Sequence, residues 1–85
     1  MTCWHVYLLR CADGTLYCGV TNDLDRRLAQ HTAGTASKYT RSRTPVRLEL
    51  AAEVPSKSDA LRLELRVKAR KKDEKIPFLA SFRQT

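Results

Sequence analysis

The fold of this chain begins at residues 4–20, WHVYLLRCADGTLYCGV, which have the pattern of two β-strands joined by a tight turn. Residues 4–11 are rich in β-forming side chains and too short for a confident helix, and residues 15–20 share this character. Asp13-Gly14 between them is a strong turn signal. The two strands are therefore predicted to form an antiparallel hairpin.

The length of the hairpin turn determines which side chains share a face of the sheet. A two-residue turn would place Tyr7 and Tyr17 on opposite faces. A three-residue turn, residues 12–14, would pair Leu9 with Tyr17 and bring the two tyrosines to one face. We favour the three-residue turn, because Gly14 then occupies the position that needs a positive φ.

A helix and a polar segment are predicted after the hairpin. Thr21 or Asn22 can cap the helix, and Gly34 suits its end. Residues 35–44 are polar and basic, which predicts a loop or a short irregular helix that Pro45 ends.

The last third of the chain predicts one strand and one long helix. Residues 46–54 alternate apolar and polar side chains at first, as a strand does. Ser56 or Ser58 starts a helix that runs to about Lys72, and residues 76–82 can add a short closing helix. The predicted fold is a single α/β (α+β) domain over residues 1–85. A small three-stranded antiparallel sheet is flanked by helices, in the order β-β-α-β-α.

The charge and composition of the chain favour some classes of function and argue against others. The 85 residues hold 16 Lys and Arg against 9 Asp and Glu, a net charge of +7, which is typical of proteins that bind nucleic acid. No apolar run approaches the ~20 residues of a membrane span, and no signal-peptide pattern precedes Arg10. Cys3, Cys11 and Cys18 lack C-x-x-C spacing and are interpreted as reduced strand residues. We expect a cytoplasmic protein that does not engage a membrane.

Glu64 interrupts the apolar stripe of the second long helix. At 100° per residue it lies between Ala60 and Val67 on one side and Leu61 on the other. A carboxylate there is costly unless it is paired, hydrogen-bonded or bound to a metal. On the pattern alone we favour an i,i+4 pair with Lys68.

Three polar residues of the first helix share one face. Asp23, Arg27 and His31 are spaced i, i+4, i+8 beside the apolar side chains of that helix. On spacing alone, Asp23 and Arg27 form a solvated pair and His31 is a structural or surface histidine.

Basic side chains gather in two segments that could contact a phosphate backbone. These residues are Lys38, Arg41 and Arg43, with Tyr39 among them, and Arg62, Arg66, Lys68, Arg70, Lys71, Lys72 and Lys75. No glycine-rich phosphate loop is present in the sequence, which argues against nucleotide hydrolysis of the P-loop type.

In chain order, these residues closely resemble the GIY-YIG nuclease superfamily. The motifs that carry the resemblance are His5-Val6-Tyr7, Tyr17-Cys18-Gly19, residues 20–28 (VTNDLDRRL) with His31, residues 37–41 (SKYTR) and residues 60–68 (ALRLELRVK). The resemblance covers about residues 3–72 and is greatest to the small stand-alone bacterial branch. That branch is similar to the catalytic subunit of a eukaryotic structure-selective nuclease.

The resemblance implies cleavage of phosphodiester bonds with one divalent cation, Mg²⁺ or another such as Mn²⁺. Glu64 matches the glutamate that anchors the metal, and one carboxylate with waters and phosphate suits a hard cation. Arg27 matches the arginine that binds the scissile phosphate and stabilises its developing charge.

The resemblance also implies that the two motif tyrosines position or deprotonate the attacking water. Tyr7 is the favoured base and Tyr17 the orienting group. A phenol with a pKa near ~10 is a poor base at neutral pH, so Arg27 and the metal are expected to lower it. His31 is a supporting candidate, and Gly19 is expected to allow close approach of backbone or substrate.

The chain departs from the family pattern in three places. His5-Val6 stands where the family name has Gly-Ile, and Cys18 replaces an apolar residue. The asparagine that often follows the metal-binding helix is missing, because the only asparagine of this chain is Asn22.

The predicted function is a metal-dependent endonuclease-like hydrolysis of DNA on branched, flap or single-stranded substrates in repair or recombination. RNA remains an alternative substrate. The alternatives are a non-catalytic DNA- or RNA-binding module and a catalytic subunit that is active only with a partner protein. The residues predicted to contact nucleic acid are Lys38, Tyr39, Arg41, Arg43, Arg66, Lys68 and Arg70.

Overall fold

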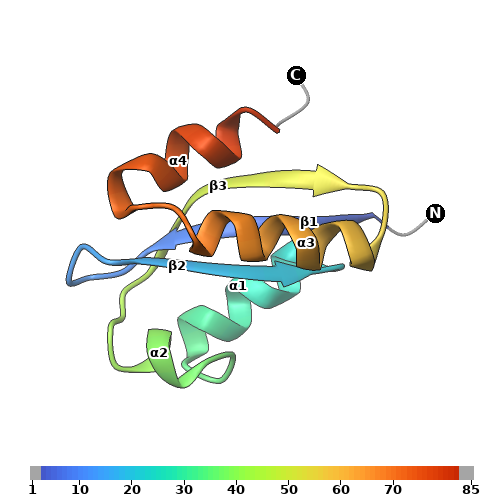
Figure 1. Cartoon of the computed structure of the whole chain (residues 1–85). Helices are drawn as coiled ribbons and strands as arrows, with labels where there is room; N and C mark the ends of the chain where they lie inside the picture. Colours follow the sequence, from blue (N-terminus) through green and yellow to red (C-terminus); the bar gives the residue numbers. More distant parts are fainter. Residues whose placement is uncertain (1–2, 83–85) are drawn as a thin grey trace.

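The computed structural model describes residues 3–82. The elements follow one another as β1 (Trp4–Arg10), β2 (Leu16–Thr21), α1 (Leu24–Ala33), α2 (Lys38–Arg41), β3 (Arg47–Val54), α3 (Lys57–Lys68) and α4 (Lys72–Ala80) (Figure 1). The three strands form one antiparallel sheet in the order β2-β1-β3. The predicted fold class is confirmed.

The hairpin has the three-residue turn that the sequence favoured. Leu9 pairs with Tyr17, and the Cys11 N–H donates to the Thr15 carbonyl at 2.9 Å to close the turn. Gly14 has a φ of 85°, which a residue with a side chain rarely adopts. In this register Tyr7 lies directly opposite Gly19.

Helices cover both faces of the sheet, with α3 and α4 on one side and α1 and α2 on the other (Figure 1). Val6 and Leu8 of β1 belong to the apolar core that Leu63 and Val67 of α3 complete. Because side chains alternate along a strand, Tyr7 points to the opposite face and meets α1 there. The sheet therefore separates an apolar core from a polar layer.

The first helix is capped by a different residue from the two predicted. The Asp23 side chain accepts a hydrogen bond from the Arg26 backbone N–H at 3.2 Å, so Asp23 is the N-cap. The Thr21 hydroxyl instead accepts from the Asp23 N–H at 3.0 Å, which shapes the turn before the helix. Gly34 ends α1 with a φ of 79°, as predicted.

The second long helix, α3, is shorter than predicted, and the closing helix, α4, is longer. Ser56 caps α3, but the helix ends at Lys68 rather than near Lys72, where α4 begins. The break between the helices lets α4 turn back over β3, where Leu79 becomes fully buried. Burial of this apolar side chain is a tertiary gain that helical periodicity does not report.

Two further expectations concern membrane-spanning segments and the cysteine thiols. No helix among residues 3–82 is long and apolar enough to cross a membrane. Cys3, Cys11 and Cys18 are free, and the last two are buried.

Candidate active site

Tyr7 stands at the head of a buried chain of hydrogen bonds. Its side chain is 2% exposed, and the hydroxyl lies 2.9 Å from Nε2 of His31 on α1. Nδ1 of His31 lies 2.8 Å from the Thr40 hydroxyl, which donates to the Ser37 carbonyl at 3.4 Å. His31 and Thr40 are both buried. The chain of contacts thus ties β1, α1 and α2 together around one phenol.

The direction of each hydrogen bond follows from the donors available. Because the Thr40 hydroxyl gives its proton to Ser37, we assign it as the acceptor of the proton on Nδ1 of His31. The lone pair on Nε2 is then free to accept the Tyr7 hydroxyl proton. His31 is therefore placed to receive a proton from Tyr7.

Burial sets the protonation states of this pair. Desolvation raises the pKa of Tyr7, and the opposing charge of Arg27 is the smaller effect. Arg27 acts on the Tyr7 pKa in the expected direction, but burial outweighs its charge and the net pKa is raised. Burial, and then the Arg27 charge, lower the pKa of His31. Both groups are neutral at pH 7.

Gly19 is required by the position of Tyr7. A Cβ built on Gly19 would lie 2.6 Å from the Tyr7 Cζ atom and would also collide with the Tyr7 hydroxyl oxygen. The ring of Tyr7 therefore lies across the bare backbone of β2. The close approach predicted for Gly19 is made by the protein's own tyrosine.

Tyr17 lies between the buried chain and the surface. Its ring centroid is 5.3 Å from that of His31 and 6.5 Å from that of Tyr7, so the two tyrosines share a face as predicted. Its other neighbour is Tyr39 of α2, at 5.6 Å. Tyr39 is 37% exposed, so this aromatic row runs from the buried phenol to solvent.

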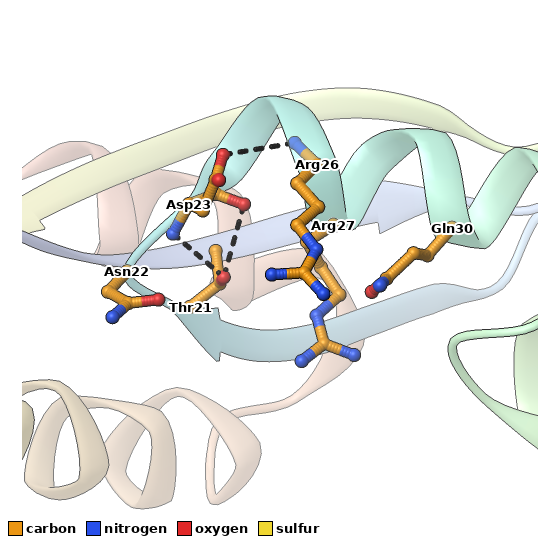
Figure 2. A pocket seen from close by; sticks show the side chains of 6 residues that line it. All are labelled: Thr21, Asn22, Asp23, Arg26, Arg27 and Gln30. Atoms are coloured by element: carbon orange, nitrogen blue, oxygen red, sulfur yellow. Dashed lines mark hydrogen bonds between the residues drawn. The ribbon is translucent and has the colours of Figure 1, made fainter.

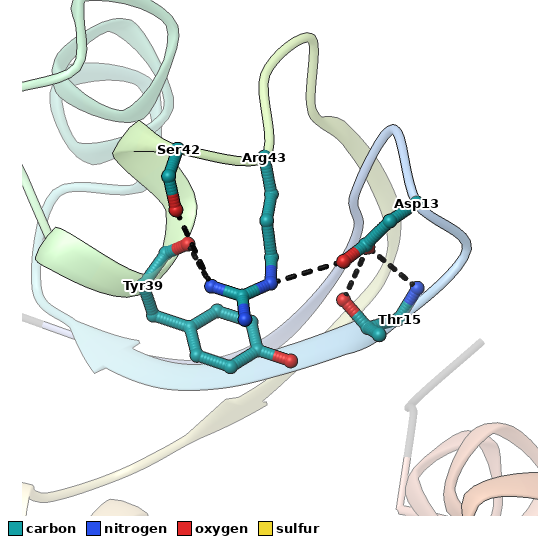
Figure 3. A network of polar contacts seen from close by, with 5 residues as sticks. All are labelled: Asp13, Thr15, Tyr39, Ser42 and Arg43. Atoms are coloured by element: carbon teal, nitrogen blue, oxygen red, sulfur yellow. Dashed lines mark hydrogen bonds and ion pairs between the residues drawn. The ribbon is translucent and has the colours of Figure 1, made fainter.

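Arg43 is engaged by the protein. Its guanidinium lies 4.0 Å from the centroid of the Tyr39 ring and donates to the Tyr39 carbonyl at 2.9 Å and to Asp13 at 3.0 Å (Figure 3). Asp13 also accepts from the Thr15 hydroxyl and N–H. These contacts join the hairpin turn to α2, so Arg43 holds Tyr39 in place.

Arg27 is half-buried on α1 and directs its guanidinium away from the helix (Figure 2). In the described part of the chain no carboxylate lies within ion-pair distance of it, so the solvated Asp23–Arg27 pair is not formed. Its positive charge acts on both Tyr7 and His31. A phosphate that reaches Arg27 would therefore lie near the phenol.

Glu64 forms the pair that the sequence pattern predicted. Its carboxylate is 17% exposed and lies 3.2 Å from Nζ of Lys68, the predicted pair. Its negative charge also raises the pKa of Tyr7, and with burial it raises the pKa of Cys18 to about 12. Glu64 therefore lies within electrostatic reach of Tyr7 and of Cys18 on the edge strand β2.

The donor set around Glu64 limits which metal it could hold. Residues 3–82 contain no group of three or more His, Cys, Asp or Glu side chains that could hold a metal ion together. A single carboxylate fits Mg²⁺, which keeps several waters and binds phosphate oxygens. It does not fit a zinc site, which needs three or four protein ligands.

The predicted phosphate contacts of α3 separate into two groups. Lys68 lies on the Glu64 side. The Arg66 guanidinium lies 5.4 Å from the ring centroids of Phe78 and Phe82, and that of Arg70 lies 4.2 Å from Phe78, so both arginines face α4. Lys68 alone of these three adjoins the candidate site.

The basic residues of α2 lie on the α1 side of the sheet. Lys38 and Arg41 are exposed, and the Arg41 side chain packs beside Gly34 at the end of α1. Neither forms an ion pair among the described residues.

Sequence reasoning missed Thr40. It lies in a polar, basic segment with no periodicity, so nothing in the sequence distinguishes it from the exposed threonines nearby. Its burial arises only when α2 packs against α1.

Comparison with known proteins identifies the family of this chain. Residues 3–76 match the family model of the GIY-YIG catalytic domain. A UPF0213 protein of Nitratidesulfovibrio vulgaris is 53% identical over 78 residues, 92% of this chain and 71% of that protein. The UPF0213 protein Reut_B5558 of Cupriavidus pinatubonensis is 48% identical over 95% of this chain and 90% of its own length.

Solved structures of relatives have the same fold. The solution NMR structure of the UPF0213 protein BH0048 from Bacillus halodurans is 41% identical, with a TM-score of 0.58 over 92% of this chain and 83% of that one. The NMR structure of EF2693 from E. faecalis is 32% identical, with a TM-score of 0.66 over 96% of this chain and 88% of that one. With residues 3–76 matching the family model, this chain belongs to the GIY-YIG domain family, a nuclease-like family, and is similar to its UPF0213 members.

Proposed function

We propose that this protein is a metal-dependent endonuclease that hydrolyses phosphodiester bonds of DNA. The observation that carries the proposal is the buried Tyr7–His31–Thr40 chain, whose phenol is within electrostatic reach of both Arg27 and Glu64. A module that only binds nucleic acid needs no buried phenol hydrogen-bonded to an imidazole. This arrangement therefore favours catalysis over simple binding.

The hydrogen bonds suggest how the attacking water loses its proton. As the Tyr7 oxygen accepts a proton from water, its own proton passes to Nε2 of His31. Tyr7 then never carries the negative charge that burial disfavours. The Thr40 hydroxyl keeps the His31 ring in the tautomer that can accept. In this mechanism His31 is the final base and Tyr7 the group that touches the water.

The remaining residues bind the phosphate. Arg27 offers two parallel N–H groups to the oxygens of the scissile phosphate, and Tyr17 orients the water or phosphate from the same face. Glu64 would exchange the Lys68 ammonium for Mg²⁺ or Mn²⁺ when substrate binds. Such a cation would neutralise charge that develops on the phosphate.

The DNA would run along the edge strand β2, between the α1–α2 side and α3. The residues proposed to contact it are Lys38, Tyr39 and Arg41, which are exposed, and Lys68, which adjoins Glu64. Arg43, Arg66 and Arg70 contact other protein groups, so we assign them supporting roles. Branched, flap or single-stranded DNA in repair or recombination is the proposed substrate, and the cytoplasm is the proposed location. A partner protein could supply further substrate recognition.

The test is cleavage of labelled single-stranded, duplex, flap and branched DNA in Mg²⁺, Mn²⁺ or EDTA. Glu64→Gln should abolish cutting and leave DNA affinity unchanged or higher, because it removes the metal ligand and a negative charge. Glu53→Gln is the matched control, since its carboxylate is 61% exposed on β3 and should be dispensable. Binding without cleavage on every substrate would favour the binding module or the partner-dependent subunit instead.

A further inference from the structure

A polar cavity opens beside Arg27 at the start of α1. It has a volume of about 160 Å³ (Figure 2). Its lining residues are Thr21, Asn22, Asp23, Arg26, Arg27 and Gln30. Every one of these side chains is polar, so the cavity suits a charged, hydrated group rather than an apolar ligand.

The cavity holds two guanidinium groups that are available to a ligand. Among residues 3–82 neither Arg26 nor Arg27 donates a side-chain hydrogen bond or forms an ion pair. The only carboxylate in the lining, that of Asp23, accepts the backbone N–H of Arg26 and is thereby fixed as the helix cap. The cavity thus has a net positive charge and several N–H donors, which are the groups that recognise phosphate oxygens.

The arrangement on α1 separates two rows of side chains. Arg27 and His31 are four residues apart and form the row that serves Tyr7. Arg26 and Gln30 are also four residues apart and form the neighbouring row, rotated by about 100° around the helix. Both rows line the same cavity, so a phosphate held by Arg26 and Gln30 would adjoin a phosphate held by Arg27.

We propose that Arg26 and Gln30 bind the phosphate adjacent to the scissile one on the same DNA strand. This inference rests on the proposed function, since it takes Arg27 as the ligand of the scissile phosphate. Two successive phosphates gripped from one helix would fix the direction in which the strand crosses β2. The cavity then determines which bond is presented to Tyr7.

Single neutral phosphates provide the test. A set of oligonucleotides each carries one methylphosphonate, moved stepwise along the strand, and their affinities are measured in EDTA so that no cleavage is needed. The proteins compared are wild type, Arg26→Ala, Gln30→Ala and Arg27→Ala. Arg62→Ala is the control, because Arg62 lies on α3 and pairs with Asp59 at 3.6 Å.

Arg26→Ala should weaken binding of the unmodified strand by about tenfold, the usual size for a hydrogen-bonded charge pair. At one phosphate, the loss of affinity caused by the methylphosphonate and the loss caused by Arg26→Ala should not add, because both changes remove the same contact. Gln30→Ala should show this at the same phosphate, and Arg27→Ala at the phosphate next to it. Arg62→Ala should be additive everywhere.

Additive effects for Arg26→Ala at every phosphate would overturn the inference, and so would coupling of Arg26 and Arg27 to the same phosphate. These outcomes do not depend on catalysis. A wild-type protein that fails to cut in Mg²⁺ but shows the two adjacent couplings would refute the nuclease proposal and retain the phosphate pair.

Discussion

At Tyr7 two effects act on one proton in opposite directions. Burial disfavours the phenolate and Arg27 favours it, and burial is the stronger effect. In the proposed mechanism, the hydrogen bond to His31 resolves this conflict, because it gives the proton a destination without leaving charge on the phenol. The proposed role of Tyr7 therefore depends on a histidine that the sequence alone presents as a supporting residue.

The depressed pKa of His31 makes stability depend on pH. The unfolded chain binds a proton at His31 near pH ~6.5, whereas the folded chain resists it. Stability should therefore be full above about pH 6.5 and fall as the pH drops below it. Urea unfolding at pH 7.5 and 5.5 measures this. If His31→Gln loses as much stability between pH 7.5 and 5.5 as the wild type does, the imidazole is not the cause of the pH dependence.

Gly19→Ala should destabilise the fold by about 1–3 kcal/mol, the range for an overpacked interior. The new methyl group would displace the buried Tyr7 ring and so break its contact with His31. We expect a lower unfolding midpoint and reduced DNA cleavage. Gly14→Ala is the control for the loss of a glycine, since its Cβ would meet nothing within 4 Å and its cost arises from the positive φ alone. Wild-type cleavage by Gly19→Ala would contradict the packing described for Tyr7.

Among the elements, the hairpin was predictable and the helix boundary was not. Gly14 and the register that joins Tyr7 to Tyr17 depend on local turn chemistry, which the sequence contains. The end of α3 at Lys68 depends on how α4 reaches β3, which is a tertiary matter. The same limit applies to Thr40, whose burial depends on how α2 packs.

The two sides of α3 should differ in function. Lys68→Ala should weaken DNA binding and lower its salt slope by up to about one unit, because Lys68 adjoins the site. Arg66→Ala should change the slope less and lower thermal stability, because its guanidinium lies over the rings of Phe78 and Phe82. Titrations over a series of salt concentrations separate the two. Equal slopes for both variants would show that the two sides of α3 contact DNA alike.

In the whole molecule, the two faces of the sheet cover different kinds of interior. The core beneath α3 and α4 is apolar, while the layer beneath α1 and α2 holds the buried polar chain. The sequence predicted the strands and their succession along the chain, since alternation and turn signals are local, but not the order β2-β1-β3 in the sheet. Local patterns alone do not bring Arg27 and Glu64, which lie on helices of opposite faces, to Tyr7, and only the family resemblance indicated that they act together.

Removing metal should leave the folded state unchanged. The core contains only apolar groups, and a single carboxylate would bind a divalent cation weakly in the absence of DNA. We expect the same thermal unfolding midpoint in EDTA and in Mg²⁺, while cleavage is lost in EDTA. A midpoint that rises several degrees with Mg²⁺ alone would indicate a structural metal site.

The contact between Tyr7 and Gly19 restricts how these two positions can change in evolution. Because the ring occupies the space of a side chain at position 19, neither residue can change freely while the other stays. A descendant that has alanine at position 19 and keeps the tyrosine would have a displaced Tyr7 ring. Under the proposed nuclease function, such a sequence would mark a lineage in which selection for cleavage has ceased, and the two positions together can be used to find it.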